Sequence, residues 1–375
     1  MSTDRDKFDR QYVTTQITEA PPVTLEDEVD QYNRLPVGET DLWEETAFAL
    51  VGESGDYDVL LWTAGYLLQS YGRGVWIDKD AIEHDIMFIA VPKAHRGTMT
   101  DNNFVRSGWH PTERLTRDKL RIERKGDEVI WHFDAQQFIA KPPLWQAKGQ
   151  IAGVTLDLTF KQIGQPLWHW GPFGEVRKAE RAGYDLFARV EGKIKTAGRT
   201  FEIANGQGVR EHILVGKPID PIRNLPAPRW MWWLYLTKDD IGINFFRPGS
   251  VDIGAVYVGD REIKYNPAAG KGSVSYTIIE RWSDPRSGFH LPVRWHLNMT
   301  SPECVVDLDI SSHGRAYEFW TGDAGTRLYC YYLCIANGFL FLRDGRRVEF
   351  KDHVMLNSSN KTILVKNETL DGPVY

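Results

Sequence analysis

Arg210, Glu211 and His212 are the residues of this chain whose types and spacing best fit acid–base chemistry. They lie in the stretch GVREHILVG, which is otherwise apolar, so an extended backbone would place Glu211 on one face and Arg210 and His212 on the other. A carboxyl group among aromatic rings is hard to ionise, and it can therefore stay protonated at neutral pH and act as an acid. We predict Glu211 and His212 as catalytic residues and Arg210 as a substrate-binding residue. The alternative is an ion cluster between domains with a structural role.

Tryptophan supplies the second group of candidate residues, because the chain has 14 of them beside 15 Tyr and 17 Phe. They cluster in Trp168-His169-Trp170 and in Trp230-Met231-Trp232-Trp233. Aromatic side chains dominate protein cores, so core packing is the alternative for any one of them. Beside an acid–base cluster, however, they predict the wall of an apolar pocket. The predicted wall residues from these clusters are Trp168, Trp170, Trp230 and Trp232.

Composition bounds the classes of function that this chain of 375 residues can have. Its net charge is −6, which argues against general binding of nucleic acid or of anionic membranes. Neither a run of about 18–20 apolar residues nor an apolar leader is present, so we expect a cytoplasmic protein without a membrane span. Three cysteines are too few for a disulfide framework. The length predicts two domains or possibly three.

The elements that must position these residues are mostly strands. Short alternating stretches are separated by Gly, Pro, Asp or Asn, as in Lys119–Arg124 and Val154–Phe160. Such a pattern predicts an all-β protein built as an antiparallel sandwich or barrel. Two short helices are expected, at Trp43–Val51 and Arg177–Ala182.

An internal repeat indicates two similar β domains. Asp157–Trp170 reads DLTFKQIGQPLWHW, and Asp307–Trp320 reads DLDISSHGRAYEFW, with Gly and Trp at the same offsets. Further on, GRTFEI at 198–203 matches GRRVEF at 345–350. Two matches in the same order predict a tandem repeat. We expect a polar arm at 1–40, a first domain at 41–204 and a second at 205–375, with Trp170 and Trp320 as equivalent packing residues.

Motifs for the common cofactors and nucleophiles are absent from the sequence. There is no G-x-S-x-G elbow, no complete dinucleotide fingerprint and no P-loop. The ten His lack H-x-H or H-E-x-x-H spacing. We therefore predict no cofactor and no metal site.

The stretch Tyr184–Gly216 resembles the signature of the AttH-like and carotenoid 1,2-hydratase (hydroxyneurosporene synthase) families. Arg229–Arg247 is similar to the Trp-rich strand pair of these families. Arg281–Asn298 is similar to their W-x-S-P-x-T-G-x-x-Y-P-x-x-W segment and adds Trp282 and Trp295 to the predicted substrate-binding residues. The matches cover roughly residues 150–320. Val209 replaces the usual Trp, and Glu211 the usual Asp, whereas His212 fits.

This resemblance implies a pair of tandem lipocalin-like antiparallel β-barrels. It also implies relatives that hydrate isoprenoid double bonds and two-barrel proteins that act as cyclases or Diels–Alder catalysts. Fold alone does not fix a function.

Two functions remain open from the sequence. The first is a cofactor-independent enzyme that acts on an apolar, unsaturated small molecule, terpenoid or polyketide-like, by acid–base hydration, isomerisation or cyclisation. The second is a lipocalin-like carrier that binds an apolar ligand without catalysis. The acid–base cluster beside aromatic material favours the enzyme, a lyase or an isomerase. Neither the substrate nor the oligomeric state follows from the sequence.

Overall fold

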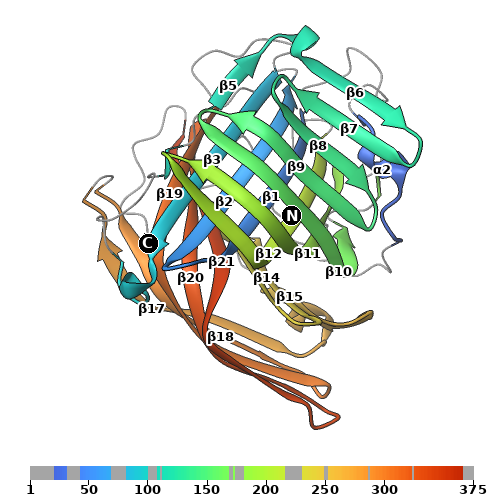
Figure 1. The fold of residues 1–375 in the computed structure, drawn as a ribbon. Coiled ribbons are helices and arrows are strands. Elements are labelled where there is room, and N and C mark those ends of the chain that lie inside the picture. Colours follow the sequence, from blue (N-terminus) through green and yellow to red (C-terminus); the bar gives the residue numbers. More distant parts are fainter. Residues whose placement is uncertain are drawn as a thin grey trace.

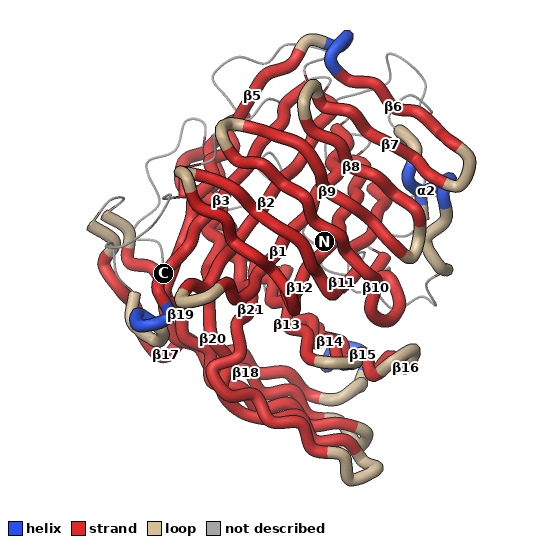
Figure 2. The backbone as a smooth tube through the Cα atoms, viewed as in Figure 1, coloured by secondary structure: helices blue, strands red, loops and turns tan. Residues whose placement is uncertain are grey.

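The structure of this chain is a computed structural model, and it describes residues 21–31, 43–68, 82–99, 108–109, 112–168, 172–173, 181–215, 230–248, 252–285, 288–322 and 325–365. Within these ranges the chain forms two large antiparallel sheets and a few short helical turns (Figures 1 and 2). The helical elements are α2 (Leu25–Glu28) and the 3-10 turns η2 (Lys93–His95), η3 (Arg117–Lys119) and η5 (Pro267–Ala269).

The first sheet contains 11 strands. They are β1 (Trp43–Ser54), β2 (Tyr57–Leu68), β3 (Ile82–Pro92), β5 (Thr112–Leu115), β6 (Leu120–Lys125), β7 (Glu128–Phe133), β8 (Gln136–Lys141), β9 (Leu144–Ile151), β10 (Val154–Trp168), β11 (Arg181–Thr196) and β12 (Arg199–Val215). Their order is β5-β3-β2-β1-β12-β11-β10-β9-β8-β7-β6. Every neighbouring pair along this path is antiparallel.

The second sheet contains 10 strands. They are β4 (Gly108–Trp109), β13 (Trp230–Lys238), β14 (Ile241–Pro248), β15 (Ile253–Val258), β16 (Arg261–Tyr265), β17 (Ser273–Ser283), β18 (His290–Thr300), β19 (Cys304–Gly322), β20 (Gly325–Leu342) and β21 (Arg347–Val365). Their order is β16-β15-β14-β13-β21-β20-β19-β18-β17, and β4 pairs with β19.

Both sheets curl into half-barrels whose edge strands are consecutive in the chain. Edge strands β5 and β6 of the first sheet are joined across η3, and edge strands β16 and β17 of the second are joined across η5. Each sheet encloses its own apolar core on one face. The prediction of an all-β chain with two tandem lipocalin-like antiparallel barrels is confirmed.

The tandem repeat is confirmed by the topology. DLTF lies in β10 and DLDI in β19, and these two strands occupy the same place in their sheets. The GRTFEI and GRRVEF segments lie at the starts of β12 and β21, which also occupy the same place in their sheets. Gly192 in β11 has φ 135° and Gly338 in β20 has φ 142°. A Cβ atom at either glycine would lie 2.0 Å from a backbone oxygen, that of Asp157 or of Asp307. Only glycine fits such a position, so both barrels need it at the same place.

The expected helix at Trp43–Val51 is wrong, because this stretch is part of β1. Phe48 and Leu50 face the core of the first barrel, whereas Ala47 and Ala49 face the second sheet. A strand that is buried on both faces lacks simple alternation, and its apolar run is easily taken for a helix. Most of the expected helix at 177–182 lies outside the described residues, and Ala182 belongs to β11.

The predicted domain boundary at 204/205 falls inside β12, which pairs with both β1 and β11 along its length. The change of sheet comes between Val215 and Trp230. Within the predicted arm, residues 21–31 are described and lie against the first barrel, where α2 meets β7 and β8 (Figure 1).

A third apolar cluster packs the two sheets against each other. It includes Trp62 of β2 and Tyr331 of β20, whose rings lie 5.4 Å apart. Buried Asp58 and His313 add a polar link across the same contact, with 3.0 Å between Oδ2 and Nε2. The outer face of β1, β2, β3, β11 and β12 is therefore an internal surface of the molecule where these strands meet the second sheet.

Candidate functional site

Strand β12 sorts the predicted catalytic cluster onto two faces. Arg210 and His212 point into the first barrel and are 1% and 0% exposed, while Glu211 points to the opposite face of the sheet. The split follows from the alternation of side chains along a regular strand. Arg210 and His212 therefore share one site, and Glu211 belongs to another.

Inside the first barrel, Arg210 pairs with Glu28, which α2 carries into the interior. Nη2 of Arg210 lies 2.7 Å from Oε2 of Glu28, and both side chains are buried. The other carboxylate oxygen, Oε1, accepts hydrogen bonds from Tyr184 Oη and, at 2.5 Å, from Trp145 Nε1. The guanidinium also lies 5.0 Å from the centre of the Phe48 ring. One carboxylate thus meets three donors that come from β9, β11 and β12.

The charges of this cluster support one another. Burial opposes ionisation of Glu28, but the nearby charge of Arg210 and the hydrogen bonds from Tyr184 and Arg210 outweigh burial and lower its pKa. Burial likewise disfavours the charged form of Arg210, yet Glu28 raises its pKa above the ordinary value. Burial raises the pKa of Tyr184 well above its ordinary value, so the phenol keeps its proton. The pair is therefore ionised in a region without water contact.

His212 lies beside this pair and contacts Glu44 of β1, with 2.6 Å between Nε2 and Oε1. The same oxygen accepts a hydrogen bond from the backbone N–H of Gln31 at 2.9 Å. The rings of Phe173 and Trp131 lie 4.9 Å and 5.7 Å from the imidazole. Burial, followed by the charge of Arg210, lowers the pKa of His212 to about 3. The imidazole is therefore neutral at neutral pH, and burial makes its protonated form unfavourable.

Three indoles of the first barrel hold the N-terminal segment, which we define as residues 21–31. Trp168 Nε1 donates to the carbonyl of Pro21 at 2.7 Å, and Trp131 Nε1 donates to the carbonyl of Glu28 at 2.8 Å. Trp145 donates to the Glu28 carboxylate, as described above. Trp168, a predicted wall residue, therefore contributes to the barrel interior and contacts the N-terminal segment.

Glu211 lies in a cluster of carboxyl groups between the two sheets. The Glu211 carboxyl group is hydrogen-bonded to Asp185 and Glu45. Burial and these two acidic neighbours raise the pKa of Glu211 well above the ordinary value. Tyr66 donates to Glu45 at 2.8 Å, and Tyr235 of the second sheet donates to Asp185 at 2.5 Å. Burial and the acidic neighbours Asp185 and Glu45 therefore favour the protonated form of Glu211, whereas Trp rings were expected to do so from the sequence.

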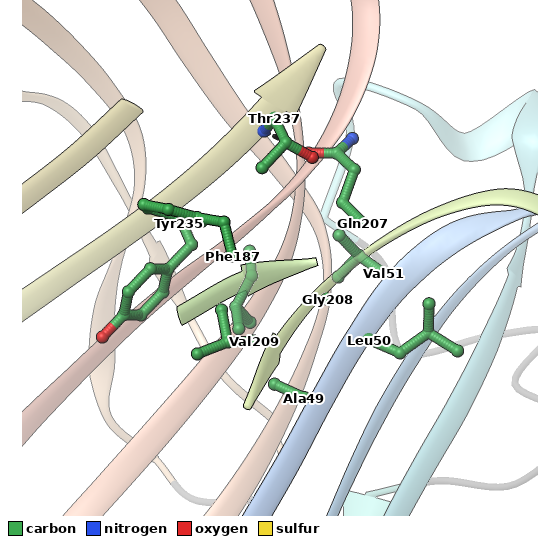
Figure 3. Close-up of a pocket in the computed structure, with 10 residues that line it drawn as sticks. Ala49, Leu50, Val51, Phe187, Gln207, Gly208, Val209, Tyr235 and Thr237 are labelled. Atoms are coloured by element: carbon green, nitrogen blue, oxygen red, sulfur yellow. Dashed lines mark hydrogen bonds between the residues drawn. The ribbon is translucent and has the colours of Figure 1, made fainter. Parts of the chain in front are cut away.

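A small pocket lies between the sheets near this cluster (Figure 3). Its volume of about 10 Å³ is close to that of one water molecule. Phe187 and Val209 of the first sheet and Tyr235 of the second contribute to its wall, and Gln207 accepts a hydrogen bond from the Thr237 N–H at 2.7 Å beside it. Neither Glu211 nor His212 lines this pocket.

The second barrel collects the other predicted tryptophans. Trp232 and Trp295 are buried in its core with ring centres 6.0 Å apart, and both pack against Tyr332. Among the residues that the structure describes, the Trp295 indole nitrogen has no hydrogen-bond partner. The interior around these two indoles is therefore aromatic.

Trp282 lies at the edge of the second core, where Arg315 stacks on its ring at 4.9 Å. Arg315 is paired with Asp284, with 2.5 Å between Nη2 and Oδ1, and Tyr317 also donates to Asp284. Trp282 is therefore part of a second cluster of carboxylate, Arg and Tyr.

The predicted binding residues thus separate into two barrels instead of forming one pocket. Arg210 and Trp168 lie in the first, and Trp232, Trp282 and Trp295 lie in the second. Trp170 and the side chain of Trp230 lie outside the described residues, as does the side chain of Trp320, so the packing equivalence of Trp170 and Trp320 stays a prediction.

Sequence reasoning missed Glu28, Glu44, Trp131, Trp145 and Tyr184. Glu28 contacts Arg210 across 182 positions of sequence. An acidic run in a polar arm is the ordinary mark of a solvated segment, and nothing local shows that one of its carboxylates is buried. Trp131 and Trp145 lie in stretches where apolar and polar side chains alternate. Their inward position on a strand could have been predicted from that alternation.

Solved structures with a similar fold match nearly the whole chain. An AttH-type protein from Nitrosomonas europaea has a TM-score of 0.56 at 13% identity, covering 92% of this chain and 98% of its own. CghA, solved with Sch210972, has a TM-score of 0.52 at 10% identity, covering 88% and 90%. Kievitone hydratase from Nectria haematococca has a TM-score of 0.47 at 10% identity, covering 94% of this chain and 95% of its own.

These likenesses show the fold, and the resemblance to AttH-like proteins is confirmed at that level. No protein-family model matches the chain, and no curated protein matches its sequence. Within the described ranges, no three His, Cys, Asp or Glu side chains converge in a way that could hold a metal ion. Helices long and apolar enough to cross a bilayer are likewise absent from those ranges.

Proposed function

We propose that this chain is a cofactor-independent enzyme that transforms an apolar, unsaturated small molecule, terpenoid or polyketide-like, by acid–base hydration, isomerisation or cyclisation. The observation that carries the proposal is the set of ionisable groups buried among aromatic rings in the first barrel. Ionisable groups with strongly shifted pKa values are concentrated at functional sites. The structure of CghA, a protein of the same fold, was solved with the small molecule Sch210972. This supports a ligand site in such barrels.

His212 is the proposed base of the first barrel. It is neutral, Glu44 orients it, and Phe173 and Trp131 flank it. An aromatic ring stabilises a nearby cation by about 0.5–2 kcal/mol once water is excluded, so these rings suit a carbocation-like intermediate. Arg210 and Tyr184 would bind an oxygen of the substrate.

Glu211 is the proposed acid, because its raised pKa favours the protonated form that protonation of an alkene requires. It faces the space between the sheets, so one substrate molecule inside the first barrel cannot touch it directly. Acid-first chemistry would therefore require a substrate between the sheets, where the described pocket admits about one water molecule, whereas base-first chemistry belongs to the barrel interior. The two variants below separate these alternatives.

The test follows deuterium incorporation from D2O into unsaturated terpenoids, with farnesol, geranylgeraniol and retinoic acid as probes. His212→Ala and Glu211→Gln are compared with two control variants, His296→Ala at a half-buried position and Glu191→Gln at an exposed one. Loss of turnover only in His212→Ala places the chemistry in the barrel, and loss only in Glu211→Gln places it between the sheets. Unchanged turnover in both removes both residues from the acid–base roles.

A carrier without catalysis is the second candidate function. The internal pairing of Arg210 with Glu28 favours it, because a satisfied buried network can be purely structural. If none of the probes that bind to the wild type takes up deuterium from D2O, the result would support the carrier and contradict the enzyme.

A further inference from the structure

Five hydrogen-bond donors converge in the first barrel, and all of them point at the N-terminal segment. They are the indole N–H groups of Trp131, Trp145 and Trp168, the hydroxyl of Tyr184 and the guanidinium of Arg210. Their acceptors are two backbone carbonyls and one carboxylate of residues 21–31. The barrel interior thus presents a cluster of donors, and its own strands supply none of the acceptors of these five hydrogen bonds. Nη1 of Arg210 donates in addition to the carbonyls of Ala47 and Glu211.

Three of the five donors form a cradle for one carboxylate. Arg210 binds Oε2 of Glu28, while Tyr184 and Trp145 bind Oε1. All three donors are buried and belong to the sheet, whereas the carboxylate comes from outside the sheet. A buried guanidinium that meets a carboxylate in this way is typical of recognition of an acid.

The N-terminal segment is held by side chains and not by a strand ladder. Among the described residues, no backbone–backbone hydrogen bond joins it to a strand; its described backbone bond of this kind runs within it, from Asp27 N–H to the Thr24 carbonyl. Val23 is buried against the core, and Leu25 and Val29 are partly buried. Release of the N-terminal segment would therefore break the indole and carboxylate contacts and the bond from the Gln31 N–H to the Glu44 side chain, without opening the sheet.

The barrel interior beyond the cradle is aromatic. Phe48 lies against the guanidinium, and its ring centre is 4.7 Å from that of Phe160. Trp168 packs edge-on to Tyr184 at 5.2 Å. A ligand that fits both parts combines an anionic oxygen pair with an apolar body.

We propose that the first barrel contains a binding site for an apolar carboxylic acid, in which Arg210, Tyr184 and Trp145 hold the ligand carboxylate in the position that Glu28 occupies. The N-terminal segment is then a displaceable occupant of this site. Exchange of one carboxylate for another leaves the buried Arg210 paired throughout, which avoids the large cost of a lone buried charge. The inference rests on the proposed function in that it names the substrate class of the same barrel.

The test uses cis-parinaric acid as the probe and its methyl ester as the uncharged control ligand, with binding followed by fluorescence. Glu28→Ala removes the internal carboxylate and should bind the acid on the order of tenfold more tightly than the wild type, because the competing occupant is weakened. The ester should show no such gain. Glu26→Ala is the matched control, since Glu26 lies on the same segment but pairs with exposed Arg124. The double variant Glu28→Ala/Arg210→Met should lose the preference for acid over ester.

Equal affinity of Glu28→Ala for acid and ester overturns the inference, as does an equal gain in Glu26→Ala. If Glu28→Ala does not fold, Glu28→Gln is measured in the same way beside hydrogen exchange of the wild type. Saturating acid should speed exchange of the amides of residues 23–31, and unchanged exchange there overturns the inference, as does an absence of binding.

The failure of this inference is distinguishable from failure of the proposed function. Binding of the acid without deuterium uptake into any probe would retain the site and remove the enzyme. Turnover of uncharged probes by a protein that shows no preference for the acid would retain the enzyme and remove the site.

Discussion

Replacement of Arg210 by Met tests the buried ion pair of the first barrel. Met fills much of the same space, but it leaves the Glu28 carboxylate with the neutral donors Tyr184 and Trp145. Removal of one partner from a buried pair costs about 3–5 kcal/mol. At about 2–4 °C for each kcal/mol, the melting temperature should fall by about 6–20 °C.

The loss of stability in Arg210→Met should depend on pH in a defined direction. In the wild type the pKa of Glu28 is lowered, so its carboxylate contributes stability above the unfolded-state pKa, and that contribution is lost as the pH falls through the folded-state pKa. In Arg210→Met, burial without the guanidinium should raise the pKa of Glu28, so the deficit is largest at neutral pH and shrinks on acidification. The difference in melting temperature should be smaller at about pH 5 than at about pH 7.

The assay is thermal unfolding followed by tryptophan fluorescence and circular dichroism at both pH values. Arg346→Met is the control, because Arg346 pairs with Asp240 at the surface, where a pair contributes about 0–1 kcal/mol. The double variant Arg210→Met/Glu28→Gln should recover part of the lost stability by removing the unpaired charge. A loss no larger than that of Arg346→Met, or a double variant that loses the sum of both single effects, would refute the reasoning.

Two further predictions concern the fold. Gly192→Ala and Gly338→Ala should each destabilise the chain by about 1–3 kcal/mol or more, since both force a Cβ atom into a backbone oxygen at 2.0 Å; chemical denaturation measures this, and tolerance at only one site contradicts the equivalence of the barrels. In Asp58, burial is outweighed by hydrogen bonds from Arg96 and His313, so its pKa is lowered and its contribution to stability is lost as the pH falls. Asp58→Asn should therefore lower the melting temperature at neutral pH and flatten its decline in acid; a parallel decline would show that Asp58 is not responsible.

Sequence patterns predicted the fold well where side chains alternate. In β6 the half-buried Leu120 and Ile122 flank the exposed Arg121, as the alternation requires. The repeat located equivalent strands in two barrels, because a shared backbone geometry keeps Gly192 and Gly338 in place. The same reasoning failed at β1, which is buried on both faces by the docking of the second barrel, a contact that no local pattern records.

The site was predicted in its parts but not in its assembly. Alternation along β12 correctly separated Glu211 from Arg210 and His212. The partner of Arg210 comes from a polar segment 182 positions away, and only the folded chain shows that Glu28 is buried. Trp232 and Trp295 were predicted to share a pocket with Arg210, but they lie in the other barrel. Local sequence patterns do not show which sheet each strand joins.

Both barrels contain a buried Arg–carboxylate pair, but the two carboxylates differ in how firmly the backbone holds them. Each has an inward Arg stacked on an aromatic ring and paired with a carboxylate that also accepts from a Tyr hydroxyl: Arg210 with Glu28, and Arg315 with Asp284.

Asp284, however, is fixed by its own turn, since its N–H donates to the Phe289 carbonyl and its carbonyl accepts from Gly288, both at 2.8 Å. It cannot leave Arg315 without unfolding the connection between β17 and β18. Glu28 lies on a segment that the described backbone bonds do not tie to the sheet. The first barrel is therefore the one whose charged interior can exchange its occupant, and a ligand that competes with the internal carboxylate should act there and leave the second barrel unchanged.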